Sequence, residues 1–128
     1  MKLDKNDAIS LCAFLFDKVK NITELKAQID LMNLKDPLGS DGLLTVIDYY
    51  QQHALNKFKD EDLIKEIMFW AEGGSYKTHL DGFNAFSPKA LITNAKKRNW
   101  IIKELPNKIL ISPENYPPIA INPNLLIG

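Results

Sequence analysis

The residue types that could support catalysis or metal binding are sparse along this 128-residue chain. Cys12 could form a Cys-His pair with His53 or His79, but it lies in an apolar run, where a thiol packs as a core residue. The carboxylates at 60–62 open an expected helix, where the helix dipole explains them without a metal. The segment Gly73–Lys77 follows a helix and lacks the Gly-Lys-Ser/Thr ending of a phosphate loop. The sequence therefore predicts a protein that is not an enzyme and needs no metal or cofactor.

A second kind of chemistry, contact with phosphates and bases, is indicated by the distribution of charge. The formal net charge is zero, yet residues 77–108 carry seven cations and two acids, a local charge of +5. Residues 1–76 carry nine lysines and thirteen acids, a charge of −4. A basic segment joined to an acidic one is typical of a nucleic-acid-binding surface, although lysines that merely solvate an exposed helix give the same pattern. Both interpretations stay open at this point.

A short helix followed by a hairpin must position the basic residues. Ser87 as N-cap and Pro88 at the first helical position mark the start of the helix. At about 100° per residue, the apolar face holds Leu91, Ile92 and Ala95, and the polar face holds Lys89, Thr93, Lys96 and Lys97. Strand-forming residues over 100–105 and 109–111 flank a turn at Leu105–Lys108, so a two-stranded hairpin is expected.

The chain before this segment is predicted to be helical. Apolar residues recur at helical spacing over 8–19, 22–32, 43–54 and 63–71. Asp7 is the expected N-cap of the first, central helix, and Asn21 with Glu24 forms a capping box for the second. Pro37 and two glycines make residues 35–42 a turn cluster. Ser40 or Asp41 then caps the third helix, and Gly73 ends the fourth.

Two regions lack a clear helical or strand pattern. A short, irregular helix is expected at about residues 76–80, followed by Phe83 and Phe86, which we expect to be buried. Beyond Ser112, four prolines predict an extended tail over 113–128. The tail is too apolar for a disordered segment, so it should pack on its own domain or on a partner.

The segment that begins Ala90-Leu-Ile-Thr-Asn-Ala-Lys-Lys-Arg-Asn-Trp-Ile-Ile-Lys-Glu resembles the recognition helix and first wing strand of the winged-helix family. Lys108-Ile-Leu-Ile-Ser112 would be the return strand. The resemblance covers residues 76–112 and implies that the exposed face of the helix enters the major groove while the wing reaches phosphate. It implies base contacts from Lys89, Thr93 and Lys96, and phosphate contacts from Lys97, Arg98, Lys103 and Lys108.

We therefore expect a mainly α protein forming a single domain over 1–128. Its parts are a helical bundle over 1–74, a winged-helix-like helix and two-stranded hairpin over 76–112, and an extended Pro-rich tail over 113–128. A lone cysteine and the absence of a signal peptide or a membrane-spanning run predict a cytoplasmic protein. The expected partner is double-stranded DNA, with the helical portion serving for homodimerisation or partner docking. The alternative is a protein-interaction module, such as an immunity protein, inhibitor, adaptor or assembly component, that binds through its tail or its acidic helical surface.

Overall fold

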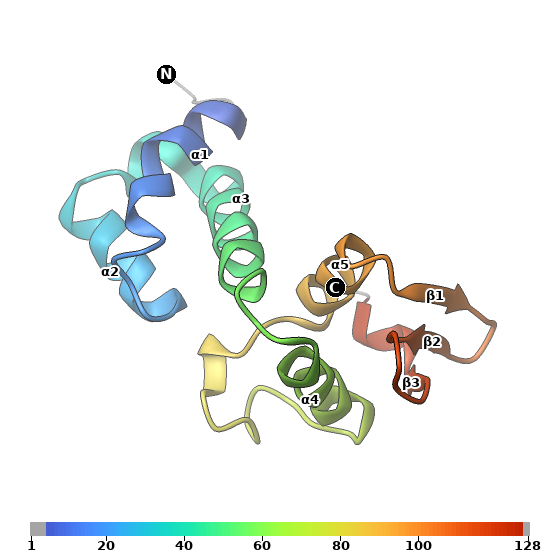
Figure 1. Cartoon of the computed structure of the whole chain (residues 1–128). Helices are drawn as coiled ribbons and strands as arrows, with labels where there is room; N and C mark the ends of the chain where they lie inside the picture. The colour runs from blue at the N-terminus through green and yellow to red at the C-terminus, as the bar shows by residue number, and fades with distance from the viewer. Residues whose placement is uncertain (1–4, 127–128) are drawn as a thin grey trace. The chain divides into compact units, whose positions relative to one another are not determined.

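The computed structural model describes residues 5–126, which divide into two compact units (Figure 1). The N-terminal unit is residues 1–54, and the C-terminal unit is residues 55–128. The division falls at Leu55 rather than near residue 75, so the fourth helix belongs with the C-terminal unit. The architecture is mainly α with a small C-terminal sheet, as the sequence predicts.

The N-terminal unit is helical. It contains α1 (Lys5–Cys12), the 3-10 turn η1 (Ala13–Leu15), α2 (Ile22–Leu31) and α3 (Lys35–Leu55), whose last residue lies in the other unit. The predicted cap of α2 is confirmed, because Asn21 Oδ1 accepts a hydrogen bond from the Glu24 N–H at 2.9 Å. The core is built from residues on one face of each helix: Ala8, Cys12, Leu15, Phe16, Ile22, Leu25, Ile29, Leu38, Val46, Ile47 and Tyr50.

Two sequence predictions for the N-terminal unit are wrong in detail. Asp7 lies in the first turn of α1 rather than at its N-cap, and the α-helix stops at Cys12, so it does not extend to residue 19. The turn cluster expected at 35–42 is present only in part: residues 35–38 are already helical, and the break is limited to Gly39, whose φ is 70°. Pro37 is tolerated there because it lies in the first helical turn, where its missing N–H has no intrahelical acceptor.

The C-terminal unit combines two helices with a three-stranded sheet (Figure 1). It contains α4 (Asp60–Ala71), the 3-10 turn η2 (Gly82–Asn84), α5 (Pro88–Lys97), β1 (Ile101–Glu104), β2 (Ile109–Ser112), β3 (Ile119–Ile121) and the 3-10 turn η3 (Pro123–Leu126). The strands are antiparallel in the order β1-β2-β3. The register pairs Ile102 with Ile111 and Ile111 with Ile119, so one face of the sheet is a row of isoleucines.

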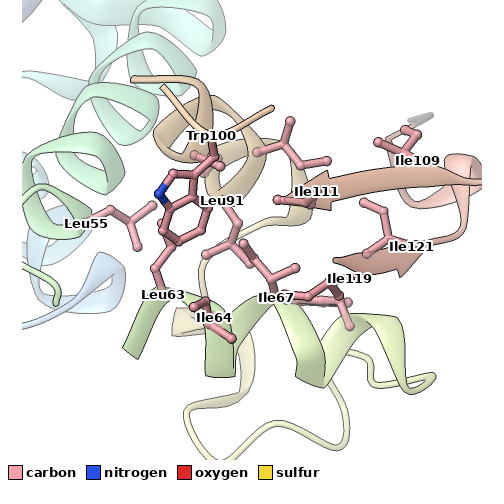
Figure 2. Close-up of a cluster of buried hydrophobic side chains, with 14 residues drawn as sticks. Leu55, Leu63, Ile64, Ile67, Leu91, Trp100, Ile109, Ile111, Ile119 and Ile121 are labelled. Atoms are coloured by element: carbon pink, nitrogen blue, oxygen red, sulfur yellow. The ribbon is translucent and has the colours of Figure 1, made fainter. Parts of the chain in front are cut away.

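This isoleucine face forms a common core with α4 and α5. Figure 2 shows Ile67 of α4 and Leu91 of α5 on the side of the sheet residues Ile111 and Ile119, while Leu63 lies beside Leu55 and Trp100. Ile111, at the centre of the sheet, is fully buried, and Trp100 closes the core between α5 and β1. The core positions α5 because the apolar residues on one side of this helix, including Leu91, Ile92 and Ala95, are buried in it.

The C-terminal residues contain more structure than predicted. The hairpin of β1 and β2 is confirmed, but the tail contains regular structure that was not predicted, the strand β3 and the 3-10 turn η3. The prolines do not prevent this strand, because Pro117 and Pro118 precede it and Pro123 follows it. Ile119 and Ile121 are buried in the core, which confirms that the tail packs on its own domain.

The segment between α4 and α5 also differs from expectation. Residues 76–80 form turns rather than a short helix, and the next helical turn, η2, begins only at Gly82. Gly73, with φ of 91°, ends α4 as predicted, and the Gly74 N–H donates to the Phe69 carbonyl at 3.0 Å. Phe86 is half-buried against Phe58, but Phe83 is exposed.

Candidate nucleic-acid interface

The polar face of α5 presents four of the predicted site residues to solvent. Its start is fixed by Ser87, whose hydroxyl accepts a hydrogen bond from the Ala90 N–H at 3.1 Å, and by Pro88 at the first position. Its end is fixed by Asn99, which takes a left-handed conformation with φ of 64°. Between these ends the exposed residues are Lys89, Thr93, Lys96 and Lys97, and the buried ones include Leu91, Ile92 and Ala95. The predicted amphipathic helix with a basic polar face is confirmed.

The lysines on α5 and the hairpin are not neutralised by any side chain that the structure describes. Within residues 5–126, the lysines at 89, 96, 97, 103 and 108 form no ion pair and no side-chain hydrogen bond. All five are exposed. Lys96 and Lys97 also lie in the last turn of α5, where the helix dipole stabilises positive charge. The surface therefore offers ammonium groups that an external anion can pair with.

The hairpin carries two of these lysines beside the helix. Lys103 lies on β1 opposite Leu110, on the face of the sheet away from the isoleucine core. Lys108 follows the tip of the hairpin, where the Leu105 N–H donates to the Lys108 carbonyl at 2.9 Å. The two residues are thus held by a regular hairpin that begins directly after the end of α5.

Arg98 has a different environment from the lysines. Its guanidinium donates to Asp60 Oδ1 at 2.6 Å and to the carbonyl oxygens of Leu55 and Phe58, each at 2.8 Å. Its Nε donates to Asn94 Oδ1 at 2.9 Å. The Arg98 side chain is 17% exposed, so it is largely engaged inside the C-terminal unit.

Asn94 extends this polar cluster on the inner face of α5. Its amide Nδ2 donates to Asn56 Oδ1 at 2.8 Å, and the residue is almost completely buried. We call Asn56, Asp60, Asn94 and Arg98 the Arg98 cluster. It ties the connection between α3 and α4 to α5, because Arg98 donates to two backbone carbonyls near the end of α3.

The division into units changes the charge balance inferred from the sequence. The C-terminal unit holds ten cations and eight acids, a net charge of +2, because the acidic first turn of α4 lies in the same unit as α5. The N-terminal unit holds six lysines and eight acids, a net charge of −2. The positive charge available for a partner is therefore a local property of α5 and the hairpin rather than of the whole unit.

The remaining candidates for chemistry are held in structural contacts. Cys12 is buried, and this burial raises the pKa of its thiol. His53 Nε2 lies 2.8 Å from Asp17 Oδ1, and His79 Nε2 lies 3.0 Å from Glu66 Oε2. Burial also raises the pKa of Tyr76, which keeps its phenol neutral at neutral pH. Over the described part of the chain, His, Cys, Asp and Glu form no group of three that could hold a metal ion.

No helix within residues 5–126 has the length and apolar character required to cross a membrane. No family model matches the chain, and neither curated proteins nor solved structures give a match.

Proposed function

We propose that the C-terminal unit binds DNA through the polar face of α5 and the hairpin of β1 and β2, in the manner of a winged-helix domain. One observation carries the proposal: five exposed lysines on a helix and the adjoining hairpin have no anionic partner within the described residues. Phosphate oxygens would supply the missing negative charge, and release of condensed counterions from DNA would drive the association.

The geometry suggests a division of roles within this surface. A major groove about 12 Å wide admits an α-helix, and α5 offers Lys89, Thr93 and Lys96 on one exposed face for base edges. Lys97, Lys103 and Lys108 would contact phosphates on either side. Arg98, in this proposal, supports the position of α5 through the Arg98 cluster instead of contacting phosphate. The connection between α4 and α5, residues 72–87, is longer than a helix-turn-helix turn, so α5 would enter the groove without α4 as its usual companion.

The test is fluorescence anisotropy of a labelled random-sequence duplex titrated with the full chain at several salt concentrations. The logarithm of the association constant should fall linearly with the logarithm of salt concentration, by about 0.9 per phosphate contacted. Lys96→Glu with Lys97→Glu should weaken binding for all sequences and reduce this slope by about 2.

The matched control is Lys26→Glu with Lys35→Glu, which changes the total charge equally at two exposed lysines of the N-terminal unit. This variant should bind as the wild type does. Equal losses in the two double variants would mean that only total charge matters, and the α5 surface would then not be the binding site. Absence of binding at low salt, where non-specific affinity is greatest, would exclude the DNA proposal altogether.

A second candidate function, protein interaction, is favoured by apolar side chains on the N-terminal unit. Leu31 is 75% exposed and Leu44 is 60% exposed, and Phe14 and Tyr49 are also exposed. Such side chains are typical of a surface that dimerises or docks a protein partner. The tail is a poorer candidate, because Ile119 and Ile121 are buried in the core of their own unit. Sedimentation velocity of the wild type and of the double variant Leu31→Glu with Leu44→Glu tests self-association through this surface. A wild-type dimer that becomes a monomer in the variant would support it. A wild type that is already a monomer would contradict it.

A further inference from the structure

Phe83 is an aromatic residue held at the surface. It is 83% exposed, although a phenylalanine forgoes hydrophobic stabilisation there. A single exposed apolar side chain is ordinary on a protein surface. Phe83 differs because its ring belongs to a series of contacting aromatic rings that starts in the buried part of α4.

The series runs outward from the core. Trp70, which is buried, contacts Tyr76 edge-on, with ring centroids 5.1 Å apart. Tyr76 in turn stacks on Phe83, with centroids 6.5 Å apart and planes inclined by 24°. At this centroid distance the two near-parallel rings are offset and overlap little. The flat surface of the Phe83 ring therefore stays largely open to solvent.

His79 fixes the segment that carries this ring. Its Nδ1 accepts a hydrogen bond from the Asp81 N–H at 3.0 Å, so the ring proton lies on Nε2 and is donated to Glu66 of α4. Its ring also contacts Phe69 edge-on at 4.7 Å, and the Gly82 N–H donates to its carbonyl at 3.0 Å. Phe83 is thus presented by an ordered segment and loses little conformational freedom when it binds a ligand.

The surroundings indicate which flat ligand would stack on this ring. Lys77 is exposed on the same segment, and the basic face of α5 begins at Lys89, six residues after Phe83. Six residues span at most about 20 Å, which is about six base steps along one strand of DNA. Stacking of bases on exposed aromatic rings next to a basic surface is how proteins hold single-stranded nucleic acid.

Building on the proposed function, we propose that Phe83 is a stacking platform for an unpaired nucleobase. The preferred ligand of the C-terminal unit is then DNA that is single-stranded or has an unpaired end, with its phosphates on the lysines of α5 and one base against the Phe83 ring.

The experiment compares two labelled probes by anisotropy: a single strand of about 20 nucleotides, longer than the sites of typical single-strand binders, and the blunt duplex of the same sequence. Phe83→Ala should weaken binding of the single strand about 5- to 150-fold and leave binding of the blunt duplex unchanged. Leu80→Ala is the control, because Leu80 is also exposed on this segment but is not planar. It should bind both probes as the wild type does.

A conservative variant separates stacking from damage to the segment. Phe83→Trp should retain single-strand binding, and its added indole fluorescence should be quenched by the single strand and not by the blunt duplex. Loss of binding in Phe83→Trp as well as in Phe83→Ala would show that the segment, rather than a stacked base, is responsible, and would overturn the proposal.

The outcomes distinguish this inference from the proposed function. If Lys96→Glu with Lys97→Glu removes binding while Phe83→Ala leaves the single strand unaffected, the stacking role is wrong and DNA binding by α5 stands. Equal weakening of both probes by Phe83→Ala would also refute stacking. A change in sedimentation coefficient for Phe83→Ala would instead identify Phe83 as a contact between copies of the chain. If the wild type binds neither probe, both proposals fail.

Discussion

The two faces of α5 carry the same kind of charge in opposite environments. On the inner side, Arg98 directs its guanidinium to Asp60 and to the carbonyls of Leu55 and Phe58. On the outer side, Lys96 and Lys97 are exposed and have no ion pair within residues 5–126. The three residues are consecutive, and a count of charge along the sequence treats them alike.

This difference follows from the chemistry of the two cations. A guanidinium presents several donors in a fixed plane, so it can satisfy two carbonyls and a carboxylate at once. An ammonium is a strongly hydrated point charge that is favoured in water or against a phosphate. The inner face of α5 therefore stabilises the unit, and its outer face is available for a partner. Four sets of substitutions test this distinction.

The largest loss of stability is expected from a substitution among the apolar residues on the inner face of α5. Leu91 is almost completely buried among α4, α5 and the sheet. Leu91→Ala removes this side chain and leaves a cavity, so the free energy of unfolding should fall by about 2–5 kcal/mol. Urea denaturation measures the change. Thr93→Ala on the outer face should alter stability by less than about 0.5 kcal/mol, and a comparable loss there would show that the outer face is also packed.

Arg98→Lys should give the next largest effect. The lysine keeps the charge but cannot replace the four hydrogen bonds of the guanidinium, so a loss of about 1.5–3 kcal/mol is expected. Thermal unfolding by circular dichroism measures it, with Lys97→Arg as a control that should leave stability unchanged. If Arg98→Lys kept full stability and weakened DNA binding instead, Arg98 would be a phosphate contact, as the sequence alone implied.

Local signals in the sequence were sufficient for much of the fold. Ser87 with Pro88 and Asn21 with Glu24 mark helix starts that the structure confirms, because each cap is formed by residues within three positions of each other. Gly73 marks a helix end for the same reason. The period of the apolar residues in α5 likewise identified which side is buried.

The features that the sequence did not reveal depend on distant residues. Arg98 contacts groups 38 to 43 positions away, so its sequence neighbours, which are basic, suggested a DNA contact instead. β3 is held by pairing with β2, and the prolines on both sides of this short strand led to the prediction of a tail without regular structure. Phe83 was expected to be buried from its residue type, yet it is exposed and its ring contacts the edge region of the core through Tyr76.

Asn94→Ala tests how much Asn94 contributes to the stability of the Arg98 cluster. The buried amide bridges Asn56 and Arg98, so its removal should cost about 1–2 kcal/mol. In a double-mutant cycle of Asn94→Ala with Arg98→Lys, the two losses should be less than additive, because the residues share a hydrogen bond. Urea denaturation of the four proteins measures the coupling. Simple additivity would mean that Arg98 is held by Asp60 and the carbonyls without help from Asn94.

The smallest effect on stability is expected where the proposed function places the largest effect on binding. Lys96→Ala with Lys97→Ala should change the free energy of unfolding by less than about 0.5 kcal/mol, because both side chains are exposed and have no partner within the described residues. The same variant should bind duplex DNA more weakly and with a shallower dependence on salt, since two phosphate contacts are lost. Urea denaturation and anisotropy on one preparation give both numbers. A substantial loss of stability would place these lysines with Arg98 as structural cations, whereas unchanged stability with unchanged binding would leave them as solvating charges with no role in recognition.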